Sequence, residues 1–438
     1  MTTDNENKSL SKPKAWVISV DMGYGHQRTA YPLRHLAPNE QVINANHYPG
    51  IPKIDRQIWE TNRKFYEFIS NFKKFPVIGE GIFAFFNRFQ KIFSYYPKRN
   101  LSKPSFQLLQ AYTLIKKGWG KHLIETLKKN PLPIVSTFFT PAFMAEVWNY
   151  PNDIYCVICD ADIARTWAPF NPKESKIKYL TPNRRTANRL KLYGVKEENI
   201  FVTGYPLPIE NIGSPNMEIV KHDLANRLVN LDPKKEYRQQ YDVLIKKYLG
   251  PLPEKSDHPL TIMFSVGGAG AQKEIAIQII ISLTNYLKNE EIKIILSAGI
   301  KEKVKNYFLQ QIKHLKLENY LGKSIEILWQ PTMNEYFNQF NQALRKTDVL
   351  WTKPSELSFY SALGIPIILA PSIGSQEDFN RDWLLQKGAA IRQENPRYTN
   401  EWFFDYWRIG AFAEAAMQGF VEIEKMGTYR IKQIMARS

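Results

Sequence analysis

The sequence predicts an α/β fold in which two Rossmann-like, doubly wound domains face each other across a cleft. Three observations support this prediction. Short apolar segments alternate with helical segments in two blocks, which a proline-rich region at 206–258 separates. A glycine-rich turn follows the first apolar segment of each block, DMGYGH after 15–20 and GGAGA after 260–266. At 438 residues, the chain is also longer than one hydrophobic core usually fills.

Composition and charge narrow the functional class. The hydrophobic content of 44% suits packed cores, and residues 1–13 form a polar tail. No apolar run has the length of a membrane span, and the N-terminus lacks the apolar core of a signal peptide, so we expect a soluble cytoplasmic protein. The net charge of +17 implies an anionic partner. Because recognisable nucleic-acid-binding modules are missing, we favour an acidic membrane face or a phosphorylated substrate over nucleic acid.

The first block opens with a predicted strand at 15–20, the turn DMGYGHQR and a helix at about 29–36. A strand, a glycine turn and a helix in this order allow a ligand to approach the backbone closely. His26 lies at the mouth of the turn, and its pKa near neutrality suits a general base. The alternative interpretation is a capping or surface histidine.

Residues 56–116 interrupt the α/β alternation with many aromatic and basic residues at helical spacing. This pattern suits a helix in the headgroup region of a membrane. It also suits a helix that packs on the domain and exposes a basic face. We favour the membrane interpretation because the whole chain is positively charged.

The rest of the first block predicts strands at 134–137, 154–159, 178–181 and 199–203, with helices at 140–148 and 183–193. Asp160 and Asp162 follow the second of these strands, where they can act in acid–base chemistry or orient a histidine. Asp160 can equally cap the turn. Cys156 and Cys159 form a C-x-x-C pair within a strand, and we interpret both as buried apolar residues rather than metal ligands or a redox pair.

The second block predicts strands at 260–266, 292–297 and 325–329, and helices at 273–288 and 333–344. A further strand ends at 350–351 and leads to the turn Lys353-Pro354-Ser355, a short helix through Leu363, a strand at 367–370 and a polar loop at 374–380. Loops at the carboxyl ends of parallel strands bind ligands, and helix N-termini there attract anions. The stretch 352–380 is therefore a candidate nucleotide-binding site.

We expect an N-terminal domain at 14–205, a linker at 206–258 and a second domain at 259–398. The helical residues 399–438 are expected to pack back towards the first domain.

Four motifs resemble those of the GT-B glycosyltransferases, above all the monogalactosyldiacylglycerol synthases and the lipid-linked N-acetylglucosaminyltransferase of peptidoglycan synthesis. They occur in the family's order and span nearly the whole chain. The motifs are DMGYGHQRTA, KYLTPNRRTANRLKLYGVKEENIFVTGYPL, SVGGAGAQKE and TKPSELSFYSALGIPIILAPSIGSQEDFN.

The resemblance implies an inverting, metal-independent hexosyl transfer without a cofactor, from a nucleotide sugar, most simply a UDP-sugar, to a lipid or lipid-linked acceptor. His26 is implied as the base that takes the proton from the acceptor hydroxyl. The implied binding residues are, for the donor, Gly267, Gly268, Gly299, Lys353, Ser355, Glu356, Gln376, Glu377 and Asn380, and, on the acceptor side, Gly23, Gly25, Asp160 and Asp162. The implied location is the cytoplasm, with peripheral attachment to the inner face of the plasma membrane.

One position departs from the family pattern. The family places a ribose-binding glutamate seven residues before the proline of the G-x-P turn, and here that position is Phe359. Glu356 lies one helical turn earlier and reaches the ribose only if the helix N-terminus is repositioned. The alternatives that stay open are a nucleotide-sugar epimerase or hydrolase on the same fold, and a binding protein that has kept the cleft without catalysis.

Overall fold

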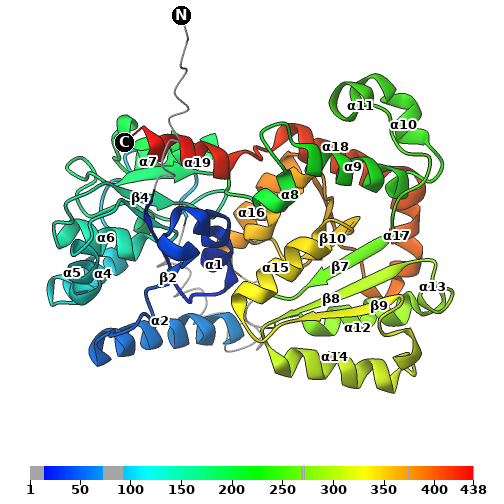
Figure 1. Cartoon of the computed structure of the whole chain (residues 1–438), viewed down its shortest axis with the longest axis horizontal. Coiled ribbons are helices and arrows are strands. Elements are labelled where there is room, and N and C mark those ends of the chain that lie inside the picture. Colours follow the sequence, from blue (N-terminus) through cyan, green and yellow to red (C-terminus); the bar gives the residue numbers. More distant parts are fainter. Residues whose placement is uncertain (1–13, 73–91, 268–269, 271, 373, 438) are drawn as a thin grey trace, which may run out of the picture.

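The computed structural model describes residues 14–72, 92–267, 270, 272–372 and 374–437. These residues form two lobes that lie side by side, each built on a parallel six-stranded sheet (Figure 1). The first lobe contains strands β1–β6 and the second lobe contains β7–β12. The predicted fold class, two doubly wound α/β domains, is therefore confirmed.

The sheet of the first lobe has the strand order β2-β1-β3-β4-β5-β6. The direction in which the chain adds strands changes between β1 and β3, which makes this pair the topological switch point of the sheet. The strands are β1 (Trp16–Ser19), β2 (Ile43–Asn44), β3 (Ile134–Ser136), β4 (Ile154–Val157), β5 (Lys178–Thr181) and β6 (Ile200–Val202).

Helices cover both faces of this sheet, so its central strands are buried on both sides, as all four residues of β4 show. The helices are α1 (Tyr24–Ala30), α2 (Lys53–Phe72), α4 (Phe106–Lys116), α5 (Lys121–Lys128), α6 (Phe139–Val147) and α7 (Arg184–Leu192). The 3-10 helices η1 (Tyr31–Leu36), η2 (Pro38–Glu40), η3 (Arg165–Trp167) and η4 (Glu197–Asn199) complete the lobe.

The sheet of the second lobe has the order β12-β11-β10-β7-β8-β9, the Rossmann arrangement, with its switch point between β7 and β10. Its strands are β7 (Thr261–Ser265), β8 (Lys293–Gly299), β9 (Ile325–Trp329), β10 (Val349–Thr352), β11 (Ile367–Leu369) and β12 (Ala390–Arg392). Its helices are α12 (Lys273–Ser282), α13 (Thr284–Lys288), α14 (Glu302–His314), α15 (Met333–Leu344) and α16 (Ser375–Gln386), with the 3-10 helices η5 (Glu318–Tyr320), η6 (Glu356–Leu363) and η7 (Pro396–Tyr398).

Residues between the two sheets fold into α8 (Ile209–Ile212), α9 (Glu218–Leu231), α10 (Glu236–Gln240) and α11 (Asp242–Leu249). The chain ends with α17 (Thr399–Arg408), α18 (Ala411–Glu422) and α19 (Gly427–Ala436). Helix α19 crosses back over the first lobe (Figure 1), where Ile431 and Met435 join the buried cluster of Val17 and Leu33. Both ends of the chain therefore contribute to the core of the first lobe.

Two predicted local features are wrong. The polar loop expected at 374–380 is the start of α16, which Gly374 caps in an extended conformation. Glu377 and Asp378 lie in its first turn, where carboxylates favour a helix N-terminus, and this signal was missed. The helix after the first glycine turn begins at Tyr24 rather than near Thr29, because the positive φ of Gly23 lets the chain turn directly into the helix.

The structure describes only part of the basic aromatic segment expected at a membrane. Helix α2 and residues 92–116 belong to the described residues, whereas 73–91 lie outside them. Among the helices described, none combines the length and apolarity needed to cross a membrane.

Candidate functional site

The two topological switch points face each other across the boundary between the lobes. Helix α1 follows β1, and Thr137 follows β3, so both lie at the switch point of the first lobe. Gly267 follows β7, and Lys353 follows β10, at the switch point of the second lobe. Open α/β sheets bind ligands at such points. The boundary is therefore the place to look for a site.

His26 lies on α1, and its neighbours fix the tautomer of its ring. Its Nδ1 is 2.9 Å from the carbonyl oxygen of Thr137. A carbonyl can only accept, so Nδ1 carries the proton and donates this hydrogen bond. The Thr137 hydroxyl in turn donates to the carbonyl oxygen of His26 at 2.9 Å. Nε2 is therefore the ring atom with a lone pair available to accept a proton.

The surroundings of His26 keep its imidazole neutral. The rings of Phe138 and Trp167 lie 4.6 Å and 6.2 Å from it, and Cys159 Sγ is 3.4 Å from Nδ1. Burial lowers the pKa of His26 to about 4, although the Thr137 carbonyl and the charge of Glu356 act in the opposite direction. The ring is thus neutral at physiological pH and able to take up a proton. Cys156 and Cys159 are both buried, as the sequence interpretation expected.

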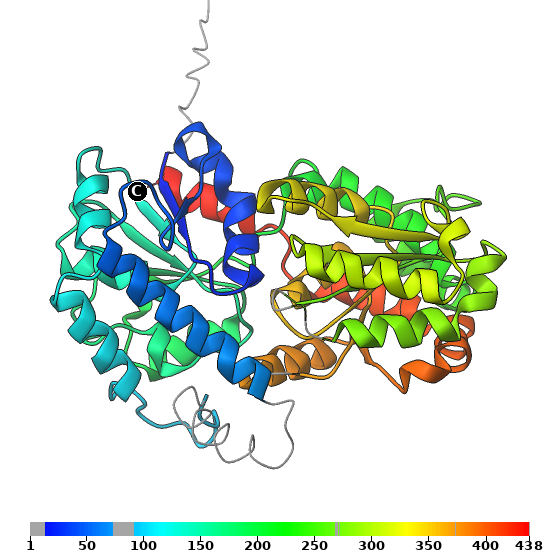
Figure 2. The ribbon, with the colours of Figure 1, turned by 90° about the horizontal axis from the view of Figure 1, so that it is seen from below.

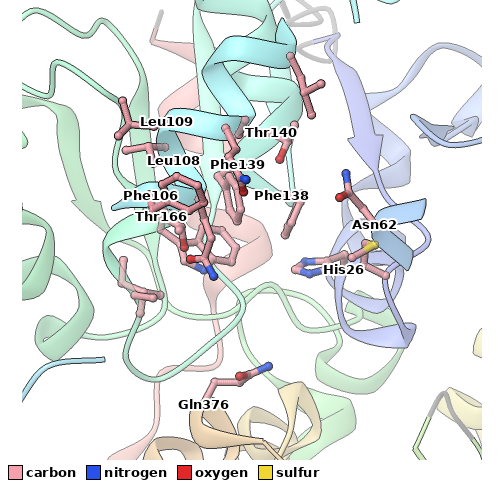
Figure 3. Close-up of a pocket in the computed structure, with 18 of the residues that line it drawn as sticks. His26, Asn62, Phe106, Leu108, Leu109, Phe138, Phe139, Thr140, Thr166 and Gln376 are labelled. Carbon is pink, nitrogen blue, oxygen red and sulfur yellow. The ribbon is translucent and has the colours of Figure 1, made fainter. Parts of the chain in front are cut away.

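His26 borders a cavity of about 700 Å³ between the first lobe and α16. In Figure 3, Gln376 of α16 lies across this cavity from the aromatic wall of Phe138 and Phe139. The apolar lining includes Phe106, Leu108, Leu109, Leu114, Phe138, Phe139, Ile163, Ala164 and Trp167. The polar lining includes His26, Asn62, Thr140, Asp160, Thr166 and Gln376. This composition, apolar walls with a few polar groups, is typical of a small-molecule site.

The two predicted carboxylates on the acceptor side have different surroundings. Asp160 lies at the boundary, where its Oδ1 accepts a hydrogen bond of 3.1 Å from Asn380 Nδ2. Burial raises the pKa of Asp160 to about 6, and the bond from Asn380 opposes this rise. Asp162 borders the same cavity, but Arg189 and Arg185 bind its carboxylate at 2.7 Å and 3.1 Å. The carboxylate of Asp162 therefore acts first as a structural ion-pair partner.

Several residues of the predicted donor site gather at the edge of the second sheet. Lys353 and Glu377 form an ion pair there. A Cβ added to Gly267 would lie only 2.6 Å from Lys353 Cε, so the lysine chain covers this glycine. The hydroxyl of Ser355 caps η6 by accepting from the backbone N–H of Leu357. Gly268 lies outside the described residues.

Asn380, another predicted donor-site residue, links the lobes. Its side chain is fully buried, and its Oδ1 accepts a hydrogen bond of 2.8 Å from the backbone N–H of Ala161. Together with its bond to Asp160, this contact joins α16 to the loop that follows β4. The amide of Asn380 thus contacts the protein itself at both of its ends.

Gly299 and the predicted glutamate position also contact the first lobe. The Tyr24 hydroxyl accepts from the backbone N–H of Ile300 at 3.1 Å and lies where a Cβ on Gly299 would be. Burial raises the pKa of Tyr24 to about 12, so the hydroxyl keeps its proton. Phe359 stacks on Tyr205 of the first lobe, with ring centroids 4.8 Å apart. The position expected to hold a ribose-binding carboxylate is thus part of an aromatic contact between the lobes.

Glu356 binds Arg28, which the sequence reasoning did not single out. Arg28 Nε is 3.1 Å from Glu356 Oε1, and the two side chains are only 2% and 11% exposed. The sequence signal was weak, because Arg28 follows His26 closely but looks like any basic residue of a helix. Gly23 and Gly25 bracket the start of α1, and Gly25 lies against Glu356. Within the described ranges, no group of three or more His, Cys, Asp or Glu residues is arranged to hold a metal ion.

A domain family of unknown function, DUF6938, matches residues 253–324. No curated protein matches the sequence. Among solved structures, MurG of Acinetobacter baumannii is similar at 14% identity over 76% of this chain and 79% of its own, with a TM-score of 0.41. A UDP-GlcNAc 2-epimerase from Neisseria meningitidis bound to UDP-GlcNAc is 11% identical over 77% and 84% of the two chains, with a TM-score of 0.41.

A glycosyltransferase from Rickettsia africae is 13% identical over 97% of this chain and 98% of its own, with a TM-score of 0.43. At this level of likeness, the strand orders themselves are the firmer basis for the fold. Two parallel sheets of doubly wound topology, with their switch points facing each other, make this chain a protein of GT-B architecture.

Proposed function

We propose that this protein is an inverting glycosyltransferase that moves a sugar from a nucleotide sugar, most simply a UDP-sugar, to a lipid or lipid-linked acceptor at an anionic membrane surface. The observation that carries the proposal is the cavity of about 700 Å³, which combines apolar walls with a neutral histidine and borders a helix of the second lobe. An acceptor in this cavity meets a base on one side and the donor lobe on the other.

The geometry of His26 supports its role as the base. Because Nδ1 donates to the Thr137 carbonyl, Nε2 is the atom that takes the proton of an acceptor hydroxyl. The hydroxyl oxygen then attacks the anomeric carbon as the bond to the nucleoside diphosphate breaks. A single displacement of this kind inverts the anomeric configuration. Asp160 borders the same cavity, and we assign it to a hydrogen bond with the acceptor.

The second lobe supplies features that suit a nucleotide-sugar donor. Helix α16 begins at the carboxyl edge of its sheet, where free N–H groups and the helix dipole favour a diphosphate. Gln376 and Glu377 lie in its first turn, and Lys353 is paired with Glu377. We assign Gln376 and Glu377 to the sugar and diphosphate, and Lys353 to the departing phosphate, which it reaches by exchanging Glu377 for the anion.

The mouth of the cavity favours an acceptor held in a membrane. Phe106 and Leu109 border the cavity, yet their side chains are 59% and 43% exposed. Phe93 and Tyr96, from the segment just before α4, are 43% and 68% exposed. The exposed basic residues Lys98, Arg99 and Lys103 belong to the same segment. Exposed apolar side chains at the cavity, together with the exposed aromatic and basic residues of the preceding segment, suit attachment to an anionic bilayer.

The test is a transfer assay with anionic vesicles, a membrane lipid extract and a panel of radiolabelled nucleotide sugars. We expect label in the lipid phase with one donor and inverted configuration in the product. Calorimetry with the matching nucleoside diphosphates should give saturable binding. Label that stays on the nucleotide as an isomer indicates an epimerase instead, and free sugar indicates a hydrolase. Binding without turnover indicates a non-catalytic protein, and absence of nucleotide binding rules out the proposal.

A further inference from the structure

Helix α1, which carries His26, is held by the second lobe as well as by its own. Arg28 lies two residues after His26, and its guanidinium inserts between α15 and η6 of the second lobe. Its carbon centre lies 4.2 Å from the ring centroid of Phe340 and 4.8 Å from that of Phe337, within cation–π range. The position of α1 therefore depends on the second lobe. In both views, α1 lies where the two lobes meet (Figures 1 and 2).

Among the described residues, Glu356 is the carboxylate that pairs with Arg28. Its Oε1 accepts the hydrogen bond from Arg28 Nε at 3.1 Å. Its other oxygen lies against the first turn of α1, where a Cβ added to Gly25 would be 3.2 Å from Oε2. A single side chain of the second lobe thus contacts α1 on both sides of His26 in sequence.

We propose that Glu356 is a positioning residue for His26: its carboxylate fixes α1, and with it the histidine, to the second lobe, instead of binding the nucleotide ribose. The proposal rests on the proposed role of His26 as the base. The proposal also explains why Phe359 occupies the position at which the enzymes that this chain resembles carry a ribose-binding glutamate. The nearest carboxylate is already engaged by Arg28, and Phe359 packs on Tyr205 between the lobes.

The pKa of His26 is a measurement that would not change if Glu356 had a merely structural role, because this pKa depends on the charges around the ring. Four titratable or charged groups lie near His26. They are Arg28 on the same helix, the Cys159 thiol and Asp160 on the loop after β4, and Glu356 on η6. The negative charge of Glu356 acts to raise the pKa of His26 against the larger effect of burial. Removing that charge without changing the shape of the side chain should therefore lower the pKa of His26 further.

The experiment compares Glu356→Gln, Glu356→Asp and Glu210→Gln in the full-length protein. Glu210 is the matched control, because it is another boundary carboxylate, bound by Asn341 at 3.2 Å, and it does not contact α1. Histidine ring NMR follows the pKa of His26, with His26→Gln to assign the signal. Calorimetry measures the binding of UDP and other nucleoside diphosphates, and kinetics separates kcat from the acceptor KM.

For Glu356→Gln we expect the pKa of His26, and the acid limb of the kcat profile, to move to lower pH by about half a pH unit. For Glu356→Asp, which keeps the charge but shortens the reach, kcat should fall roughly ten- to hundredfold. In both variants nucleotide affinity should change less than about threefold, and Glu210→Gln should match the unaltered protein in all three measurements.

If Glu356 instead binds the nucleotide ribose, we expect the reverse pattern. Loss of nucleotide affinity in Glu356→Gln with an unchanged His26 pKa would overturn the proposal. An unchanged kcat in Glu356→Asp would overturn it as well. If no nucleoside diphosphate binds the unaltered protein, the proposed function fails, and the NMR titration still decides whether Glu356 acts on His26.

Discussion

The two switch points of this molecule differ in what surrounds them. At the first, between β1 and β3, the carboxyl edge of the sheet borders a cavity of about 700 Å³ whose wall includes His26. At the second, between β7 and β10, side chains among the described residues cover two glycines of the sheet edge. Lys353 covers Gly267, and Tyr24 of the opposite lobe covers Gly299.

Because of this difference, the two sites set different requirements for a ligand. A molecule enters the first site without displacing an ion pair, because the cavity is already shaped and mostly apolar. In the proposed function, a diphosphate at the second site exchanges the carboxylate partner of Lys353 for phosphate oxygens. We therefore expect the first site to select its ligand by shape and apolar contact. We expect the second site to select its ligand by charge.

The largest expected effect tests whether chemistry belongs to the first site. His26→Ala should lower kcat by roughly 100- to 10,000-fold, the usual contribution of a general base, while nucleoside diphosphate binding stays within about threefold. His35→Ala is the matched control. His35 also donates from Nδ1 to a backbone carbonyl, that of Pro32 at 2.9 Å, and burial lowers its pKa too, but it does not border the cavity. Equal losses in both variants would contradict a specific role for His26.

The next effect concerns the contact that joins the two sites. Arg28→Ala leaves the buried carboxylate of Glu356 without its partner and should lower the free energy of unfolding by roughly 3–5 kcal/mol. Arg34→Ala, which removes longer and more exposed ion pairs to Glu40 and Glu210, should cost less than about 1 kcal/mol. Chemical denaturation monitored by tryptophan fluorescence measures both. Similar losses would show that the boundary contact is no stronger than a surface pair.

A pair of substitutions separates the ligands of the two sites. Ala164→Phe places a ring in the cavity and should raise the acceptor KM about tenfold or more, with donor affinity unchanged. Gly299→Ala places a Cβ against the Tyr24 hydroxyl of α1 and should alter donor affinity more than the acceptor KM. Steady-state kinetics with each substrate varied in turn checks both variants. If each substitution affects both substrates equally, the sites are not separable.

The proposed membrane attachment predicts an effect of the basic residues just before α4. Replacing Lys98, Arg99 and Lys103 with Glu should weaken the free energy of binding to anionic vesicles by about 1 kcal/mol per charge at low salt. Co-sedimentation with the vesicles measures this binding. Neutral vesicles should show little difference between the two proteins. The same change at Lys303, Lys313 and Lys316 on the second lobe is the control for net charge. Equal loss from both triple variants would contradict a defined membrane-facing patch.

The last effect is the pH dependence of stability. Because the folded pKa of His26 is about 4, below the usual 6.5, the unfolded state binds more protons between these values, and the free energy of unfolding falls as the pH drops through that window. Asp160 acts in the opposite direction between 3.8 and about 6, since its pKa is raised. Denaturation at several pH values should show a shallower acid loss in His26→Gln and a steeper one in Asp160→Asn. Identical slopes would contradict the proposed burial of both groups.

Local patterns predicted the elements better than the contacts. Strand β9 and helix α15 were predicted with the boundaries that the structure shows, because an apolar strand pattern and a threonine cap mark them in the sequence. The start of α16 was mistaken for a loop because a polar segment after glycine was given more weight than its acidic first turn. Polar composition alone was a poor guide there.

The site shows the same limit more strongly. His26 was singled out because a glycine turn after a strand has a recognisable form. Arg28 and Glu356 are separated by 328 positions, and nothing in either local sequence indicates that they meet. The contact between Phe359 and Tyr205 is equally invisible, since stacking depends on how the lobes face each other. Contacts between lobes are set by packing and not by local periodicity.

The return of α19 to the first lobe constrains how the lobes can move. The chain passes between them near Gly204–Leu207 and again near Glu424–Thr428, and these passages touch, with Thr428 Oγ1 donating to the Leu207 carbonyl at 2.5 Å. Because these two adjacent passages are the places where the chain connects the lobes, we expect any relative motion of the lobes to be a rotation about them. In such a rotation, the parts of the lobes farthest from these passages move the most. A small rotation would therefore change the access of a ligand most strongly on that far side.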